Sequence, residues 1–594
     1  MVAMRPKDIF TLSGINRINS DLGVHRHEVL TAIILVAALV VAARILAPFE
    51  IRQDQSLQLE AAQRLCQGLG LTTTRSVATS LDVAEGPAPV YLTDWPPAFS
   101  LIVAGFLLSG MPLEIALKVI YAFTSLMGWI GWGIVANYFV ARHFKKEVKI
   151  PWIYLVIPSL LPVLYTPWWG GTDIFLWAGV PYIVLLLFLA NYHQRSAKFI
   201  VSAGLLFGFL CSIRYASFFI AIAASLILLQ TTFPSIKLFL QRSALFFLPS
   251  LIFILPVFIY VNQYRPAESN LPQLGNSEFA WTLLETLASL STASVMLTGF
   301  PWLLHIVRQS EALNYAVGLG TLLIIISLPL MLWKSTASSF SRLRENASLS
   351  FSLLPLSVVL FLVVIALMSG MIYIAEQRYF QAVGLIGVFI AFDLFMNRQA
   401  PRLLRTASGV IVAAFVAYSL VYLMFVGIPR KRADLIHTVL SYTQSRSREL
   451  STSDDIGYPE HRLYTRKEGS RRKLKELHAS YPGAIFFILR NYQLYVYDNL
   501  QEKAPVTGLD LRLFPTIDHW KRSYTSKAIN VFWVLEQPTA EMNLKESQLS
   551  FVPNVNLKSV YYDPFEKTMI LKSNFPAGHK FFNDNLQNSK PALH

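Results

Sequence analysis

Acidic and basic side chains stand beside several apolar segments of the chain, and their types suit chemistry on a phosphate ester. The carboxylates are Asp54, Asp94 and Asp173, and the arginines are Arg214 and Arg378. A carboxylate can take the proton of an attacking hydroxyl. A guanidinium binds phosphate through paired donors and stays charged at any working pH. Together, these groups are what transfer from a phosphate to a hydroxyl requires.

Polar neighbours extend this set of candidates. Tyr215 follows Arg214 directly, and Arg378 has Glu376 shortly before it and Tyr379 after it. We assign Asp54 as the catalytic carboxylate and Arg214, Arg378 and Tyr379 to phosphate binding. The residues that we assign to substrate binding are Asp94, Asp173, Tyr215 and Glu376.

Each candidate also has a simpler explanation that the sequence leaves open. A carboxylate just beyond a membrane helix, such as Asp54, is often only interfacial and solvated. Arg378 could extend to the lipid headgroups, and Asp173 or Thr172 could cap a helix. Arg214 has apolar sequence on both sides, where a charge costs about 2.5–3.5 kcal/mol on insertion scales. A functional role is therefore favoured more at Arg214 than at Arg378.

The composition indicates an integral membrane protein. Of 594 residues, 54% are hydrophobic and 15% charged, and the apolar runs are too long for the helices of a soluble domain. The net charge of +15 is typical of basic cytoplasmic loops facing anionic lipid, so it gives little support to nucleic-acid binding. Cys66 and Cys211 are the only cysteines, which excludes a disulfide framework and a cysteine-based metal site.

Apolar runs of about 20 residues each, some shorter, predict an α-helical polytopic protein with about eleven transmembrane helices. Basic clusters between the runs predict the cytoplasmic loops, and an odd number of spans places the termini on opposite faces. The candidate residues then share the extracytoplasmic side. Segments 97–110 and 281–307 are predicted to lie at the membrane surface. The predicted spans are 29–48 (a retained signal anchor), 115–139, 150–165, 174–191, 199–213, 216–232, 243–262, 313–333, 351–373, 379–396 and 407–428.

The composition changes after Gly427, and no further apolar run follows. We therefore divide the chain into a membrane domain, 1–428, with an external loop at 49–97, and a soluble domain, 429–594. The soluble domain is predicted to be a small α/β domain on the extracytoplasmic side. It has a helix at 471–481 and strands at 484–489, 492–497, 530–535 and 568–571.

Three segments give the chain a family resemblance. The first is the loop that opens at Asp54 and returns through Asp94-Trp95-Pro96-Pro97. The second is the glycine-rich run 203–215, which ends in Arg214-Tyr215, and the third is Gln377-Arg378-Tyr379. Over about residues 28–428 the chain resembles the GT-C membrane glycosyltransferases, and among them the dolichyl-phosphate-mannose-protein mannosyltransferases of glycosyltransferase family 39.

The resemblance implies an inverting glycosyltransferase in the plasma (inner) membrane, with its active face extracytoplasmic. It would take a monosaccharide from a polyprenyl-phosphate carrier and pass it to a glycan, lipid or protein. Asp54 is followed by Gln55 where many members carry a second acid. This departure leaves a Mg²⁺ or Mn²⁺ ion at Asp54 open, with Glu50, Glu60 or Asp173 as a further ligand.

Other classes of protein remain as alternatives. An O-antigen polymerase or ligase also uses lipid-linked sugars, but its main external loop usually comes between later helices. A transporter or flippase would place charges at the bilayer midplane on broken helices, whereas the charges here gather at one interface. A non-catalytic relative that serves as a scaffold has no feature in the sequence that distinguishes it from the enzyme.

Overall fold

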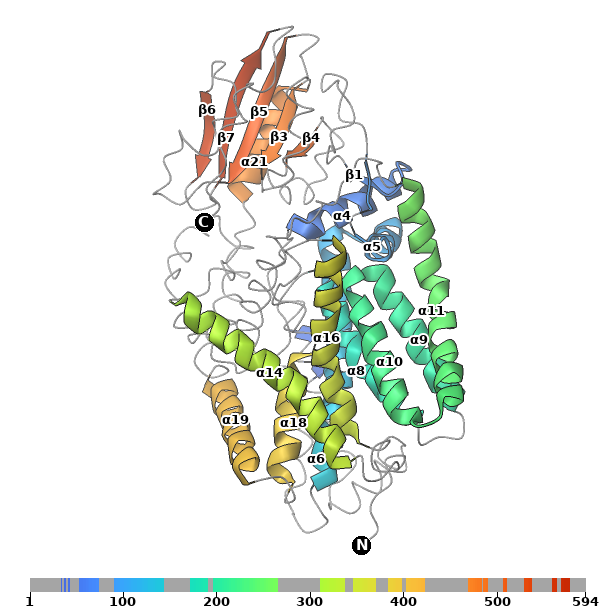
Figure 1. Ribbon diagram of the computed structural model, residues 1–594. Coiled ribbons are helices and arrows are strands. Elements are labelled where there is room, and N and C mark those ends of the chain that lie inside the picture. The colour runs from blue at the N-terminus through green and yellow to red at the C-terminus, as the bar shows by residue number, and fades with distance from the viewer. Residues whose placement is uncertain are drawn as a thin grey trace. The chain divides into compact units, whose positions relative to one another are not determined.

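The computed structural model describes most of the predicted apolar helices and a C-terminal sheet (Figure 1). The described residues are 53–73, 90–93, 95–143, 171–190, 196–264, 310–336, 346–369, 383–397, 402–421, 468–482, 484–489, 506–509, 528–536, 558–563 and 568–576, with a few helical positions between 34 and 42. Predicted span 29–48 falls mostly outside these ranges, and span 150–165, segment 281–307 and strand 492–497 fall wholly outside them.

The chain divides into two compact units, which are described separately. One unit comprises residues 1–48 and 117–438, and the other comprises 49–116 and 439–594. The predicted boundary at 428/429 falls in a stretch that the structure does not describe, so it stays a prediction.

The first unit is helical, as the apolar runs predict, and its helices coincide with the predicted spans wherever these are described. In chain order they are α6 (Leu113–His143), α8 (Asp173–Leu189), α9 (Ser196–Ile213), the short 3₁₀ helix η2 (Tyr215–Phe218), α10 (Phe219–Thr232), α11 (Ile236–Tyr264), α14 (Glu311–Thr336), α16 (Ala347–Ser369), α18 (Gly384–Met396) and α19 (Arg402–Val421).

Four helical segments in the described part of the chain are long and apolar enough to cross a membrane: Leu113–Ala136, Tyr215–Thr232, Ile236–Tyr264 and Ala312–Lys334. By length and composition they make the chain an integral membrane protein. Shorter apolar helices also occur, among them Asp173–Leu189 and Ala197–Ile213. The number of eleven spans stays a prediction.

Two glycines bring α9 and α11 into close contact. A Cβ atom at Gly204 would collide with the backbone oxygen of Phe246, and one at Gly208 would lie 2.5 Å from the backbone oxygen of Ser250. Small residues four apart allow helix backbones to approach in this way in membranes. Phe207, between them, stacks on Phe246 with ring centroids 5.3 Å apart. The glycine-rich run therefore has a packing role.

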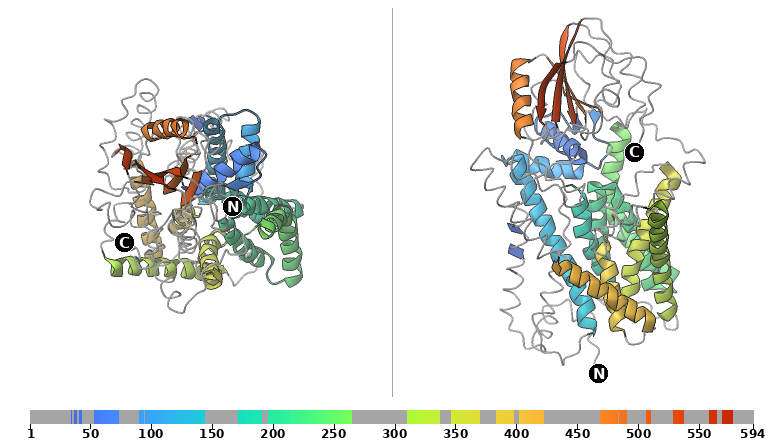
Figure 2. Two further views of the ribbon diagram at one scale, coloured as in Figure 1. Left: turned by 90° about the horizontal axis from the view of Figure 1, so that it is seen from above. Right: turned by 90° about the vertical axis from the view of Figure 1, so that its left-hand side faces the viewer.

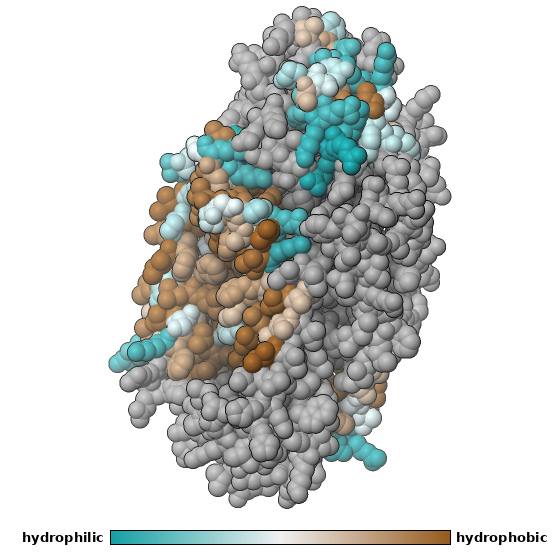
Figure 3. Space-filling model, turned by 180° about the vertical axis from the view of Figure 1, so that it is seen from behind, coloured by the Kyte–Doolittle hydropathy of each residue, from teal (hydrophilic) through white to brown (hydrophobic). Residues whose placement is uncertain are grey.

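The helices of this unit differ in how far their side chains are exposed. α11 and α14 leave most of their apolar side chains exposed, for example Leu248, Ile252 and Leu323. α6 and α10 are mostly buried within the unit. Figure 3 shows hydrophobic side chains gathered over one part of the surface of the described helices. Since apolar surface of this extent is stable against lipid, α11 and α14 are the helices suited to face the bilayer.

The second unit begins with α4 (Gln53–Cys66), a polar helix within the predicted external loop. It packs against α5 (Ala98–Leu108), where the Ser100 hydroxyl donates to the Gln58 carbonyl oxygen at 2.8 Å. Strands β1 (Thr72–Thr73) and β2 (Val90–Tyr91) pair antiparallel between the two helices in the sequence. The predicted surface element at 97–110 is thus largely helical.

The C-terminal residues form a mixed five-stranded sheet with α21 (Glu468–Ser480) on one face (Figures 1 and 2). The strand order is β4-β3-β5-β7-β6, with β3 parallel to β4 and β5, and β7 antiparallel to β5 and β6. His478 of α21 stacks on Phe486 of β3. The strands are β3 (Ile485–Leu489), β4 (Val506–Leu509), β5 (Ile529–Glu536), β6 (Lys558–Asp563) and β7 (Thr568–Phe575).

Three of these strands, β3, β5 and β7, coincide with predicted ones, and α21 lies close to the predicted helix. The edge strands β4 and β6 were not predicted. Their sequences explain this, because Val-Thr-Gly-Leu is short and contains glycine, and Lys-Ser-Val-Tyr-Tyr-Asp has polar ends. The extracytoplasmic position of this domain stays a prediction.

Candidate functional site

The chain breaks between α9 and α10 at Arg214. Its backbone is extended, with φ −151° and ψ 125°, and it separates the end of α9 from η2. The amide of Arg214 still donates to Leu210 at 2.8 Å, and Ser217 donates from its amide to the Arg214 carbonyl at 3.1 Å. The Ser217 hydroxyl also bonds the Leu210 carbonyl oxygen, at 3.1 Å. The break is therefore held by hydrogen bonds on both sides, which directs the arginine side chain away from its own helix.

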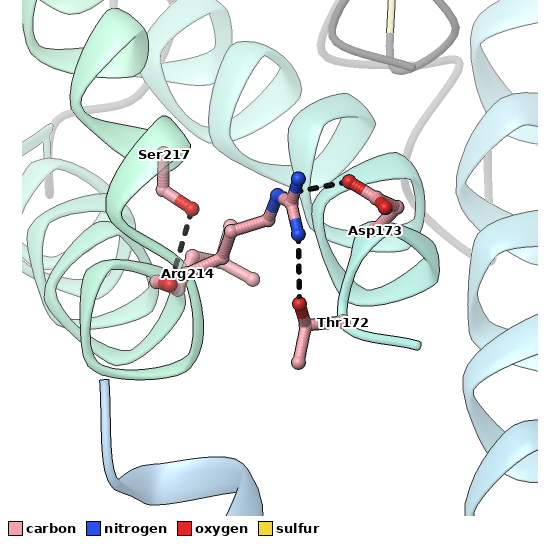
Figure 4. Close-up of polar contacts among 5 residues, drawn as sticks. Thr172, Asp173, Arg214 and Ser217 are labelled. Atoms are coloured by element: carbon pink, nitrogen blue, oxygen red, sulfur yellow. Dashed lines mark hydrogen bonds and ion pairs between the residues drawn. The ribbon is translucent and has the colours of Figure 1, made fainter. Parts of the chain in front are cut away.

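Arg214 lies against the first residues of α8 (Figure 4). Its Nε is 2.8 Å from Oδ1 of Asp173, and one terminal nitrogen, Nη1, donates to the Thr172 hydroxyl at 3.0 Å. The contact between Arg214 and Asp173 is an ion pair. The two charged side chains are only 11% and 12% exposed. Partial burial strengthens their attraction, because water screens it less.

The turn before α8 is fixed from another helix. Gly171 has φ +124°, a conformation that glycine adopts without strain. Its amide donates to the Tyr121 hydroxyl of α6 at 2.8 Å. Thr172 stands at the N-cap position of α8 but makes no capping bond with its side chain, and its hydroxyl accepts from Arg214 instead. The capping role considered for Thr172 is therefore wrong.

Close packing of α6, α8 and α9 supports the site. The Trp132 indole donates to the Trp177 carbonyl oxygen at 3.0 Å, and the Tyr182 hydroxyl donates to the Met127 carbonyl oxygen at 2.7 Å. Gly179 of α8 has no room for a Cβ beside Leu210 of α9. The two hydrogen bonds hold α8 against α6, and the close approach at Gly179 sets α8 beside α9, where Asp173 meets Arg214.

The structure brings together two of the predicted site residues, Asp173 and Arg214. Tyr215 is half-buried and begins η2, directly after Arg214. Asp54 is the second residue of α4, and its side chain is not among those described. The remaining predicted residues fall between the described ranges: Asp94, Glu376, Arg378 and Tyr379.

A metal site was left open by the sequence. Within the described ranges, no group of three or more His, Cys, Asp or Glu side chains is close enough to hold an ion. Asp173 is in contact with a cation of the protein, and Glu60 is fully buried in α4. A Mg²⁺ or Mn²⁺ ion at Asp54 therefore stays an expectation from the resemblance.

A second polar cluster, which the sequence analysis missed, ties α10, α16 and α18 together. The Ser350 hydroxyl donates to the Gln230 side-chain oxygen at 2.9 Å, and the Gln230 amide donates to the Asn346 carbonyl at 3.0 Å. Ser348 donates to the buried carboxylate of Asp393. A lone acid inside the apolar run of α18 was the available signal, since charges within membrane helices are rare without a partner.

No family model matches the sequence, and no curated protein matches it significantly. Similar solved structures include ArnT from Cupriavidus metallidurans bound to undecaprenyl phosphate, with 11% identity and a TM-score of 0.42 over 92% of this chain and 98% of that one. Another is an Archaeoglobus fulgidus oligosaccharyltransferase tethered to an acceptor peptide, with 12% identity and a TM-score of 0.34 over 81% of this chain and 64% of that one. Both TM-scores lie below 0.5, and both identities are far below 25%.

Proposed function

We propose that this chain is a GT-C-type membrane glycosyltransferase, which moves a monosaccharide from a polyprenyl-phosphate donor to an extracytoplasmic acceptor. The observation that carries the proposal is the placement of Arg214. It stands between two apolar helices, is mostly buried, and is held against the first residues of α8. Ionisable side chains among membrane helices are rare and commonly functional, and a guanidinium that meets one carboxylate can also bind a phosphate. Arg214 is therefore a candidate site for an anion.

The proposed reaction makes specific demands on this arginine. The acceptor hydroxyl attacks the anomeric carbon, the bond from that carbon to the phosphate oxygen breaks, and the configuration inverts. The donor is a phosphodiester with one negative charge, and the leaving polyprenyl phosphate is a monoester with nearly two. Because charge grows on the phosphate as the bond breaks, a fixed guanidinium stabilises the transition state more than the bound donor.

Two further groups complete the proposal. Asp54 would take the proton of the acceptor hydroxyl, in keeping with the GT-C resemblance of its loop. Arg378 and Tyr379 would bind the phosphate with Arg214. A Mg²⁺ or Mn²⁺ ion would supply additional positive charge if Asp54 is one of its ligands.

The test is phosphate binding by an Arg214→Lys variant. Lysine keeps the charge but loses the planar pair of donors, so undecaprenyl phosphate should bind roughly 10–100-fold more weakly, as expected for the loss of a hydrogen bond to a charged group. Binding is measured on purified protein in nanodiscs by native mass spectrometry. Arg402→Lys is the matched control, because Arg402 is exposed at the start of α19. Equal binding by both variants would remove Arg214 from the phosphate site.

A further inference from the structure

The arginine assigned to the donor phosphate already has an anionic partner. Asp173 Oδ1 lies 2.8 Å from Arg214 Nε, while the neutral Thr172 hydroxyl accepts from Nη1 at 3.0 Å. A phosphate that approached Nε would meet this carboxylate. Two anions at one guanidinium repel each other, and partial burial makes the repulsion stronger than it is in water. Donor and Asp173 therefore compete for the same cation.

The Asp173 carboxylate has a second favourable position, at the start of its own helix. It is the first residue of α8, at the positive end of the helix dipole. The dipole favours a carboxylate in the first turn of a helix. A rotation of the Asp173 side chain along the start of α8 would free Nε and keep the carboxylate in this favourable field. Thr172 is neutral and keeps its contact with Nη1, so the guanidinium stays oriented during the exchange.

We propose that Asp173 closes the Arg214 site when no phosphate is bound, and that the phosphate of the donor displaces it. This inference rests on the proposed function. The closed ion pair keeps the buried arginine satisfied in the resting protein, and its return after transfer helps to expel polyprenyl phosphate. Asp173 is thus a positioning residue that regulates access to Arg214.

Removal of the Asp173 charge should strengthen the binding of undecaprenyl phosphate. A site that is open in only one molecule in about ten loses about tenfold in apparent affinity. Asp173→Asn removes the competing charge with little change of shape, so it should tighten the binding of undecaprenyl phosphate by about this factor. If Asp173 only oriented Arg214, the same change would weaken binding.

The experiment compares four variants with the full-length wild type in nanodiscs, using undecaprenyl phosphate as the probe. Asp173→Asn should bind it more tightly. Thr172→Val, the matched control, removes a neutral oxygen that contacts the same guanidinium, so it should give no gain. In Arg214→Gln, the further change Asp173→Asn should also give no gain, because the contested cation is gone.

The outcomes separate this inference from the proposed function. Weaker or unchanged binding by Asp173→Asn, while Arg214→Gln loses binding, overturns the closing role of Asp173 but leaves Arg214 as the phosphate ligand. Unchanged binding by Arg214→Gln overturns the proposed function itself. A gain in affinity for Asp173→Asn that persists without Arg214 also overturns the inference, since it would come from the general loss of a negative charge.

Discussion

Replacing Gly204 with alanine should separate α9 from α11 and destabilise the protein. The added Cβ would collide with the backbone oxygen of Phe246, and a Cβ at Gly208 would lie 2.5 Å from the oxygen of Ser250. Ordinary contact is near 3.4 Å, and a backbone oxygen cannot turn aside as a side chain can. Overpacking of this kind costs about 1–3 kcal/mol, whereas alanine gains about 1 kcal/mol over glycine in helix propensity. The net loss expected is about 2 kcal/mol, towards the upper limit because the overlap is deep.

Gly320 provides the matched control, because it lies within α14 and a Cβ there would meet nothing within 4 Å. Gly320→Ala should therefore stabilise by up to about 1 kcal/mol, through helix propensity alone. Reversible unfolding in mixed micelles with increasing dodecyl sulfate gives both values. The double change at Gly204 and Gly208 should cost less than the sum of the single changes, since one shift of α11 relieves both collisions. Equal stability of Gly204→Ala and Gly320→Ala would refute the close packing of α9 on α11.

Two further predictions concern the second unit. Asp54→Asn cannot accept a proton, so transfer in membranes should slow by roughly 10²–10⁴-fold while undecaprenyl phosphate still binds; full complementation by this variant at native expression would remove Asp54 from the mechanism. Burial raises the pKa of the Cys66 thiol, so less thiolate forms near pH 7 and its labelling should speed up as the pH rises. In intact cells an impermeant thiol reagent should therefore label Leu69→Cys, exposed just beyond α4, much faster than native Cys66; labelling of Leu69→Cys only after lysis would contradict the external position of the loop.

The helices could be predicted well from the sequence because a chain that spans a lipid bilayer must satisfy its own backbone hydrogen bonds. Backbone groups in the bilayer must be satisfied within a helix, so long apolar runs such as the predicted span 243–262, which lies within α11, have few alternatives. The glycine-rich run 203–215 was predicted as a family feature, and the structure adds a physical reason for two of its glycines. This reason depends on the facing backbone of α11, which hydropathy does not encode.

The contact between Asp173 and Arg214 could not be predicted, although both residues were selected. They are 41 positions apart, and their residue types and neighbours predict separate roles, Asp173 in binding substrate and Arg214 in binding phosphate. Their meeting depends on the packing of α8 against α6 through Trp132 and Tyr182, and against α9 at Gly179, which no periodicity reveals. The hydroxyl of Tyr121 was missed for the same reason, because a tyrosine in an apolar helix is usually read as part of the core.

The ion pair with Asp173 bears on whether Arg214 has a function or only a structural role. A charge between two apolar helices costs about 2.5–3.5 kcal/mol on insertion scales, and a partner such as Asp173 offsets part of that cost without any function. A purely structural pair, however, would be no less stable as two well-packed apolar residues, since replacing buried ion pairs in this way is often neutral or stabilising. The pair here joins the ends of α8 and α9, where the side chains are mostly but not wholly buried. A charge that is held in place and can still exchange its partner is what the binding and release of a phosphate would require.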